Sequence, residues 1–138
     1  MKFLNTEDCF EKGLLKKDIP NEDLAKKSLK QANFFLKETE DLIELNKKQI
    51  AVISLYNAFF HVSRSLLFKD GIKERSHYCI ARYVDENYKL EKYLNAYETI
   101  MSIRHNVQYA TEEVEIDIDL TEFFNICVEF IKEVEKLL

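Results

Sequence analysis

The chain has 138 residues and a formal net charge of −5, with a pI near 5.3. Its 2 Gly and 1 Pro are too few for the many tight turns of a β-sandwich, a barrel or a glycine-rich nucleotide fold. The acidic balance argues against a protein that coats nucleic acid non-specifically. These numbers predict a single soluble, all-α domain over residues 1–138.

Cys9, Cys79 and Cys127 are far apart and form no CxxC pair. This spacing favours reduced thiols packed as small hydrophobic side chains over a disulfide framework or a zinc site. Acidic residues near the N-terminus are unlike a secretory signal, and the most apolar stretch, residues 51–60, is about half the length that a membrane span needs. We therefore expect a cytoplasmic protein with no membrane segment, no metal and no cofactor.

Hydrophobic periodicity predicts a short N-terminal helix followed by five main helices. The short helix covers about residues 6–17. Pro20 to Asp23 form a helix-start signature, and the second helix follows them to about residue 45. A third helix covers about residues 47–69 and ends before Gly71. Further helices are expected at about 74–87, about 89–109, and from residue 119 or 121 onwards.

Residues 113–120 break the helical pattern, because acidic and apolar residues alternate there with the period of a strand. The sequence offers no second strand to pair with this segment, so we expect an extended connector with an acidic outer face. The acidic charge of residues 112–119 and of the helix that follows would screen a basic cleft or attract a basic partner. A simple solvated surface explains it as well.

All four arginines and all three histidines lie between residues 51 and 109, so this segment is where anion binding or proton transfer is expected. Within the apolar third helix, Ser54, Asn57, His61 and Arg64 recur at steps of three and four residues, which places them on one narrow face. Such a face is a satisfied structural network, a face open to solvent, or the wall of a polar cleft. We regard Asn57, His61 and Arg64 as candidate ligand-binding residues.

A second cluster lies at the end of the fifth helix. The spacing places Arg104 beside Gln108, and His105 beside Tyr109, one helical turn apart. A cation at a helix C-terminus also interacts favourably with the helix dipole. This effect explains the presence of Arg104 or His105, but it explains the cluster of all four residues less well. No facing pair of metal ligands is present, because His77 and Cys79 are only two residues apart and His61 lies on another helix.

Three stretches of this sequence, residues 56–67, residues 71–79 with His77, and residues 103–109, resemble the HEPN domain proteins (higher eukaryotes and prokaryotes nucleotide-binding) in their order and spacing. The similarity runs from about Gly13 to the C-terminus and is closest to the small prokaryotic HEPN group. It implies an up-and-down helical bundle that forms a homodimer with a cleft near the interface. Many relatives are encoded beside a minimal nucleotidyltransferase in two-gene toxin–antitoxin modules.

The resemblance also bears on catalysis. Some HEPN proteins are metal-independent ribonucleases whose signature is an arginine, a polar residue and then a histidine four to six residues beyond the arginine. Arg104 matches the arginine and His105 matches the polar residue, but Tyr109 stands where the histidine is expected. A phenol is a poor proton acceptor near neutral pH, so the catalytic set Arg104, His105 and Tyr109 departs from the family pattern.

The sequence therefore leaves three hypotheses. The first is a noncatalytic or weakly active HEPN component that binds a nucleotide, RNA or a nucleotidyltransferase partner in an Arg/His-lined cleft, where Asn57, His61, Arg64, His77 and Gln108 would contact the ligand. The second is a metal-independent ribonuclease toxin that uses Arg104 with His105 or His61. The third is an interaction module without a ligand.

Overall fold

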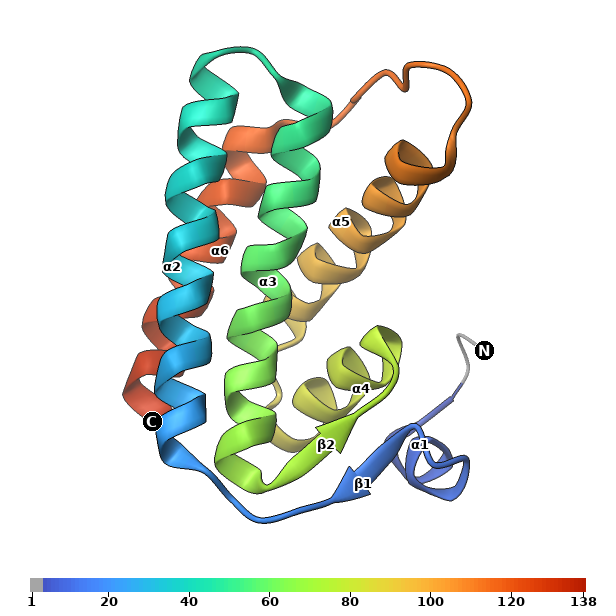
Figure 1. Cartoon of the computed structure of the whole chain (residues 1–138), viewed down its shortest axis with the longest axis vertical. Helices are drawn as coiled ribbons and strands as arrows, with labels where there is room; N and C mark the ends of the chain where they lie inside the picture. The colour runs from blue at the N-terminus through green and yellow to red at the C-terminus, as the bar shows by residue number, and fades with distance from the viewer. Residues whose placement is uncertain (1–3) are drawn as a thin grey trace.

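The computed structural model of the chain describes residues 4–138, which form a helical bundle and one small antiparallel sheet (Figure 1). The elements are α1 (Thr6–Glu11), β1 (Leu15–Lys17), α2 (Glu22–Glu44), α3 (Lys48–Asp70), β2 (Ile72–Glu74), α4 (His77–Tyr88), α5 (Glu91–Tyr109) and α6 (Leu120–Leu137). The long helices α2 and α3 lie side by side, and α5 and α6 pack against α3. The predicted helical bundle with a short N-terminal helix is confirmed.

Helix α3 is the centre of the core, as its nearly all-round apolar sequence predicts. It contacts α2, α4, α5, α6 and β2, and Val52, Leu55, Phe59 and Leu66 are fully buried. By length and composition α3 also qualifies as a membrane span, so its apolar run is longer than expected. However, 67% of its most apolar window is buried inside the bundle, as in the core helices of soluble proteins.

The predicted helix ends are governed by identifiable caps. The Asn21 side chain accepts a hydrogen bond from the Leu24 amide at 3.0 Å and starts α2. Gly71 ends α3 with a left-handed φ of 71°. The Asp119 side chain accepts bonds from two amides of the first turn and starts α6.

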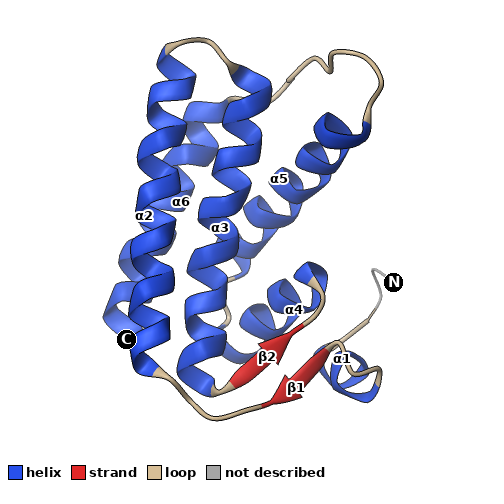
Figure 2. Ribbon diagram, viewed as in Figure 1, coloured by secondary structure: helices blue, strands red, loops and turns tan. Residues whose placement is uncertain are grey.

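Two expectations about local structure were wrong. The first helix ends at Glu11 rather than near residue 17, because Gly13 takes a left-handed φ of 71° and redirects the chain. Residues 15–17 then pair antiparallel with residues 72–74 (Figure 2). Helix α4 starts at His77 rather than at residue 74, because Ser76 caps it by accepting a bond from the Cys79 amide at 3.2 Å.

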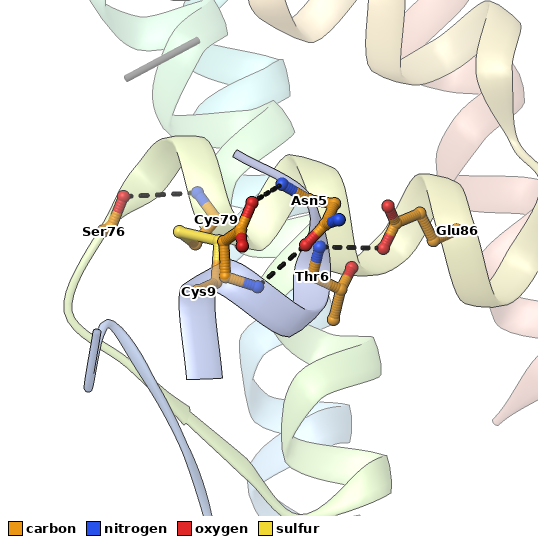
Figure 3. The surroundings of a disulfide bond; sticks show 7 residues. Asn5, Thr6, Cys9, Ser76, Cys79 and Glu86 are labelled. Atoms are coloured by element: carbon orange, nitrogen blue, oxygen red, sulfur yellow. Dashed lines mark hydrogen bonds between the residues drawn. A yellow bond between two sulfur atoms is a disulfide. The ribbon is translucent and has the colours of Figure 1, made fainter. Parts of the chain in front are cut away.

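The expectation that all three cysteines are reduced was also wrong. Cys9 of α1 and Cys79 of α4 form a disulfide with their Cα atoms 5.9 Å apart, although 70 residues separate them in the sequence. Figure 3 shows this disulfide beside the bond in which the Thr6 amide donates to Glu86 Oε2 at 2.9 Å. Cys127 is buried and free, as predicted.

The segment between α5 and α6 is an extended connector, as its alternating sequence predicts. Val114, Ile116 and Ile118 are half-buried, whereas the acidic residues between them are exposed. The Val114 amide donates a hydrogen bond to Gln49 Oε1 at 2.9 Å, which ties the connector to the start of α3.

Candidate functional site

The polar residues of α3 do not form one cleft wall. Ser54 is buried against α2, where its hydroxyl donates to the Phe35 carbonyl and accepts from the Thr39 hydroxyl, both at 2.9 Å. These bonds satisfy all three groups within the core. Ser54 therefore joins two helices, and Asn57 lies half-buried on the neighbouring part of α3.

The His61 side chain packs against neighbouring aromatic rings. Its ring stacks on Phe35 of α2 with a centroid separation of 5.6 Å and meets the edge of Phe60 at 5.0 Å. Burial, with a further contribution from the Arg64 charge, lowers the pKa of His61 to about 4. His61 is therefore neutral at pH 7, and its ring contacts are with α2 and its own helix.

Arg64 faces the end of α3 and strand β2. Its Nε lies 3.5 Å from Glu74 Oε1, and its guanidinium carbon lies 4.8 Å from the centre of the Phe68 ring. A small hollow at this corner is lined by Asp18, Ile19, Arg64, Phe68, Gly71, Ile72, Lys73 and Glu74. The charge of Arg64 is thus offset within the chain by Glu74.

Arg104 is positioned differently. Its guanidinium carbon lies 4.2 Å from the centre of the Tyr56 ring, and its Nη1 donates to Gln108 Oε1 at 2.6 Å, the pair that the i,i+4 spacing predicts. The side chain is half-buried, and its Nε is buried without a hydrogen-bond partner. Within residues 4–138, no carboxylate forms an ion pair with this arginine.

His77, the first residue of α4, reaches the same place from another direction. Its Nδ1 and the Tyr56 hydroxyl share a hydrogen bond, and its ring lies 4.5 Å from that of Phe60. Desolvation by this packing, followed by the charge of Arg104, lowers the pKa of His77. At pH 7 His77 is therefore a neutral imidazole next to a fixed cation.

A pair of tyrosines supports this arrangement. Tyr97 of α5 is fully buried, and its ring centre lies 5.8 Å from that of Tyr56. Burial raises the pKa of both phenols, against the opposing charge of Arg104, so both stay protonated at pH 7. We call Tyr56, His77, Tyr97, Arg104 and Gln108 the Arg104 cluster.

Sequence reasoning did not select Tyr56 and Tyr97 as site residues. For Tyr97 a signal existed, because it precedes Arg104 by two helical turns and so shares its face of α5. No comparable signal links Tyr56 to His77, since their contact depends on how α3 and α4 pack together.

His105 and Tyr109 lie on the exposed side of α5 and contact each other, with ring centres 4.8 Å apart. Tyr109 is 70% exposed. His105 shares a shallow open hollow with Arg104, and this hollow is lined by Tyr78, Glu98, Met101, Ser102, Arg104, His105 and Asn106. Arg104 thus lies near two exposed histidines, because it packs on Tyr56, to which His77 bonds, and shares the hollow with His105.

Among the described residues 4–138, no group of three or more His, Cys, Asp or Glu side chains is arranged to hold a metal ion. The groups that the cluster offers a ligand are the guanidinium of Arg104, the imidazole of His77 and the amide of Gln108, since the phenols of Tyr56 and Tyr97 are buried. These groups suit an anion with several oxygen atoms, such as a phosphate.

The fold and the site define a small helical-bundle protein with an arginine-centred polar cluster between α3, α4 and α5. The comparison with protein families identifies it more closely, since the HEPN domain model matches residues 25–137. The chain therefore belongs to the HEPN family, with the match beginning at residue 25 rather than near residue 13. Comparisons with curated proteins and with solved structures gave no match.

Proposed function

We propose that this protein is a noncatalytic HEPN component that binds a phosphate group of RNA or of a nucleotide at the Arg104 cluster. The observation that carries the proposal is the state of Arg104. Its guanidinium is half-buried, held by Tyr56 and Gln108, and paired with no carboxylate in residues 4–138. An anionic ligand would supply hydrogen-bond acceptors and a counter-charge to this partly desolvated guanidinium.

The neighbouring groups favour binding over cleavage. Cleavage of RNA without a metal requires a proton acceptor, a proton donor and positive charge at the phosphate. Arg104 supplies the charge, but the motif position of the family's histidine holds Tyr109, which is exposed and packed on His105. A site that keeps the cation and lacks the motif histidine is suited to hold a phosphate intact.

The proposal extends to partners. The HEPN family is associated with nucleotidyltransferase pairs, and we propose such a pairing here, with the HEPN chain as a homodimer. Exposed apolar side chains are available for such contacts, among them Phe34 at 54% and Leu45 at 64% exposure. Light scattering of the purified protein tests the dimer, and co-purification with the product of the adjacent gene tests the pairing.

Fluorescence anisotropy with a labelled single-stranded RNA and a labelled nucleoside triphosphate tests the binding site. Arg104→Gln is expected to weaken both interactions at least tenfold at low salt, because it removes a charge-assisted contact. Lys132→Gln, an exposed substitution on α6, is the matched control and should bind like the wild type. If neither ligand binds the wild type, or if Arg104→Gln binds like the control, the proposal is wrong.

The second candidate is a metal-independent ribonuclease that uses Arg104 with a histidine. The observation that favours it is the neutral His77 imidazole beside Arg104, with His105 in the adjoining hollow. His61 is packed against α2 instead. Incubation of RNA with the protein in EDTA tests this candidate, and cleavage that disappears in Arg104→Ala and in either His77→Gln or His105→Gln would replace the binding proposal.

A further inference from the structure

The two-stranded sheet presents an unusual outer face. Its register pairs Leu15 with Glu74, Lys16 with Lys73, and Lys17 with Ile72. Leu15 and Ile72 are buried against the core, and successive side chains of a strand point to opposite faces, so Lys16 and Lys73 point outwards together. Arg75 lies two residues after Lys73 and continues the same face. We call Lys16, Lys73 and Arg75 the outer ribbon face.

This face concentrates uncompensated positive charge. Lys16 and Lys73 are directly opposed across the ladder, an arrangement that destabilises a strand pair. All three side chains are exposed, and none of them forms an ion pair with a carboxylate in residues 4–138. Glu74, the acid nearest in sequence, is occupied by Arg64 on the other side of the ribbon. The chain as a whole has a net charge of −5, so a local cluster of three cations is unusual in it. Such a cluster favours the binding of an anionic ligand.

The ribbon leads directly into the Arg104 cluster. Strand β2 ends at Glu74 and α4 begins at His77, so only Arg75 and Ser76 lie between the ribbon and the imidazole that bonds to Tyr56 (Figure 1). The other strand is fixed as well, because the Cys9–Cys79 disulfide joins the element before β1 to the first turn of α4 (Figure 3). The outer ribbon face and the cluster therefore keep a constant relative position.

The chemistry of the outer ribbon face favours a polyphosphate chain. It carries long cationic side chains and no exposed aromatic residue, unlike the aromatic-rich centre of a protein interface or the apolar face that a membrane-surface helix inserts. A single strand of RNA has a phosphate at every nucleotide, so it can place one phosphate at Arg104 and others on the ribbon. A nucleoside triphosphate holds its phosphates in one compact group, and we expect it to bind at the Arg104 cluster alone.

We propose that the outer ribbon face binds the phosphate backbone of a single-stranded RNA whose neighbouring phosphate occupies the Arg104 cluster. This inference rests on the proposed function and names RNA, rather than a free nucleotide, as the ligand class. Strand β1 lies outside residues 25–137, the part of the chain that matches the family. Lys16 is thus a contribution of the N-terminal segment to the site, whereas Lys73 and Arg75 lie within the matched region.

The test compares two charge-matched triple variants. One variant, Lys16→Gln/Lys73→Gln/Arg75→Gln, removes the outer ribbon face. The other, Lys26→Gln/Lys30→Gln/Lys37→Gln, removes three exposed lysines of α2 that form no ion pair in residues 4–138. Both variants, the wild type and Arg104→Gln are titrated into labelled single-stranded RNA and labelled nucleoside triphosphate over a range of salt concentrations.

The ribbon variant is expected to bind RNA at least tenfold more weakly than the α2 variant at low salt. Its dependence of log K on log[salt] should be shallower by about 2, since each phosphate contact of a single strand contributes about 0.7. Its binding of the nucleoside triphosphate should equal that of the wild type. Thermal melting provides the folding control, because removal of the opposed lysines should leave the melting temperature unchanged or raise it.

The outcomes separate the two proposals. If Arg104→Gln loses both ligands but the ribbon variant binds RNA like the α2 variant, the ribbon inference alone is wrong. If the wild type binds neither ligand, the proposed function fails as well. A ribbon-dependent interaction with polyglutamate or with anionic lipid vesicles that equals the one with RNA would also overturn the inference, because the face would then recognise negative charge of another class.

Discussion

The guanidinium of Arg104 lies over the Tyr56 ring at 4.2 Å, and this contact joins α5 to α3 at the point where His77 of α4 bonds to the same tyrosine. A cation is thereby held beside a neutral imidazole although nothing in the local sequence places them together. Burial is the main cause that lowers the pKa of His77, and the positive charge of Arg104 lowers it further. This coupling can be measured directly.

Replacement of Arg104 by Gln should raise the pKa of His77. Removing the cation removes a repulsion that disfavours the imidazolium, so the proton binds more readily. NMR titrations of the His77 ring protons in the wild type and in Arg104→Gln measure the change in pKa. Lys30→Gln, on the distant surface of α2, should leave this pKa where it is, and an unchanged value in Arg104→Gln would show that the two side chains are not neighbours in solution.

Loss of the disulfide should destabilise the protein. Replacing Cys9 and Cys79 by Ala removes a cross-link that closes a 70-residue separation, which is worth about 2–4 kcal/mol. Urea unfolding of the double variant and of the wild type, each with and without a dithiol reductant, measures the difference. The reductant should affect the wild type alone.

Thiol titration of the denatured wild type provides the complementary check. One free thiol, from Cys127, is expected without reductant and three with it. Three thiols under both conditions would mean that the disulfide does not form. Disulfides persist mainly in oxidising compartments, so the state of these cysteines in the cell bears on the expected cytoplasmic location.

The helices could be predicted from the sequence because their signals are local. Asn21 and Gly71 mark helix ends through their own side-chain and backbone chemistry, and the i,i+4 pair of Arg104 and Gln108 follows from helical spacing alone. For the same reason the alternating acidic connector was correctly distinguished from a helix. Each of these features is decided by residues within a few positions of one another.

Apart from the end of α1 at Gly13 and the start of α4 at Ser76, which have local causes, the features that sequence reasoning missed depend on distant contacts. Strands β1 and β2 have three residues each, too few for a periodic pattern, and their partners are far apart in the sequence. The pairing of Cys9 with Cys79 depends on the same docking of the N-terminal segment. In the site, the bond between Tyr56 and His77 arises from the packing of α3 against α4, which local patterns do not encode.

Gly71 and Gly13 share a left-handed conformation, but only Gly71 also lies close to the backbone of another segment. Comparing their alanine variants therefore separates the free-energy costs of these two features. Both have a φ of 71°. A Cβ added at Gly71 would lie 2.6 Å from the Asp18 carbonyl oxygen, whereas one added at Gly13 would meet only the end of the Lys16 side chain at 3.9 Å. Gly13→Ala should therefore cost about 1–2 kcal/mol, the cost of the left-handed conformation.

Gly71→Ala should cost more, about 3 kcal/mol or above, because the loop of residues 18–20 must also move. Urea denaturation of the two variants measures the difference. Equal losses would mean that the chain near Asp18 yields without cost. In that case the loop would not be packed as tightly against the end of α3 as the structure places it.

His61 makes stability depend on pH in a defined window. Its pKa is lowered from 6.5 to about 4 in the folded protein, so between these values the unfolded chain binds the proton and the folded chain does not. Stability is therefore fully present above pH 6.5 and is lost as the pH falls towards 4. The loss attributable to His61 should be on the order of 1–2 kcal/mol, less than the full shift implies, because solvent reaches part of the ring.

His61→Phe is the matched variant, since it keeps an aromatic ring on Phe35 and cannot titrate. Denaturant unfolding at several pH values between 4 and 7 should show a smaller loss of stability for the variant than for the wild type. The difference between the two curves isolates His61 from His77, whose lowered pKa acts in the same direction. Parallel curves would mean that the His61 ring is hydrated in the folded state, and the packing of α2 against α3 at Phe35 would then be looser than the stacked geometry requires.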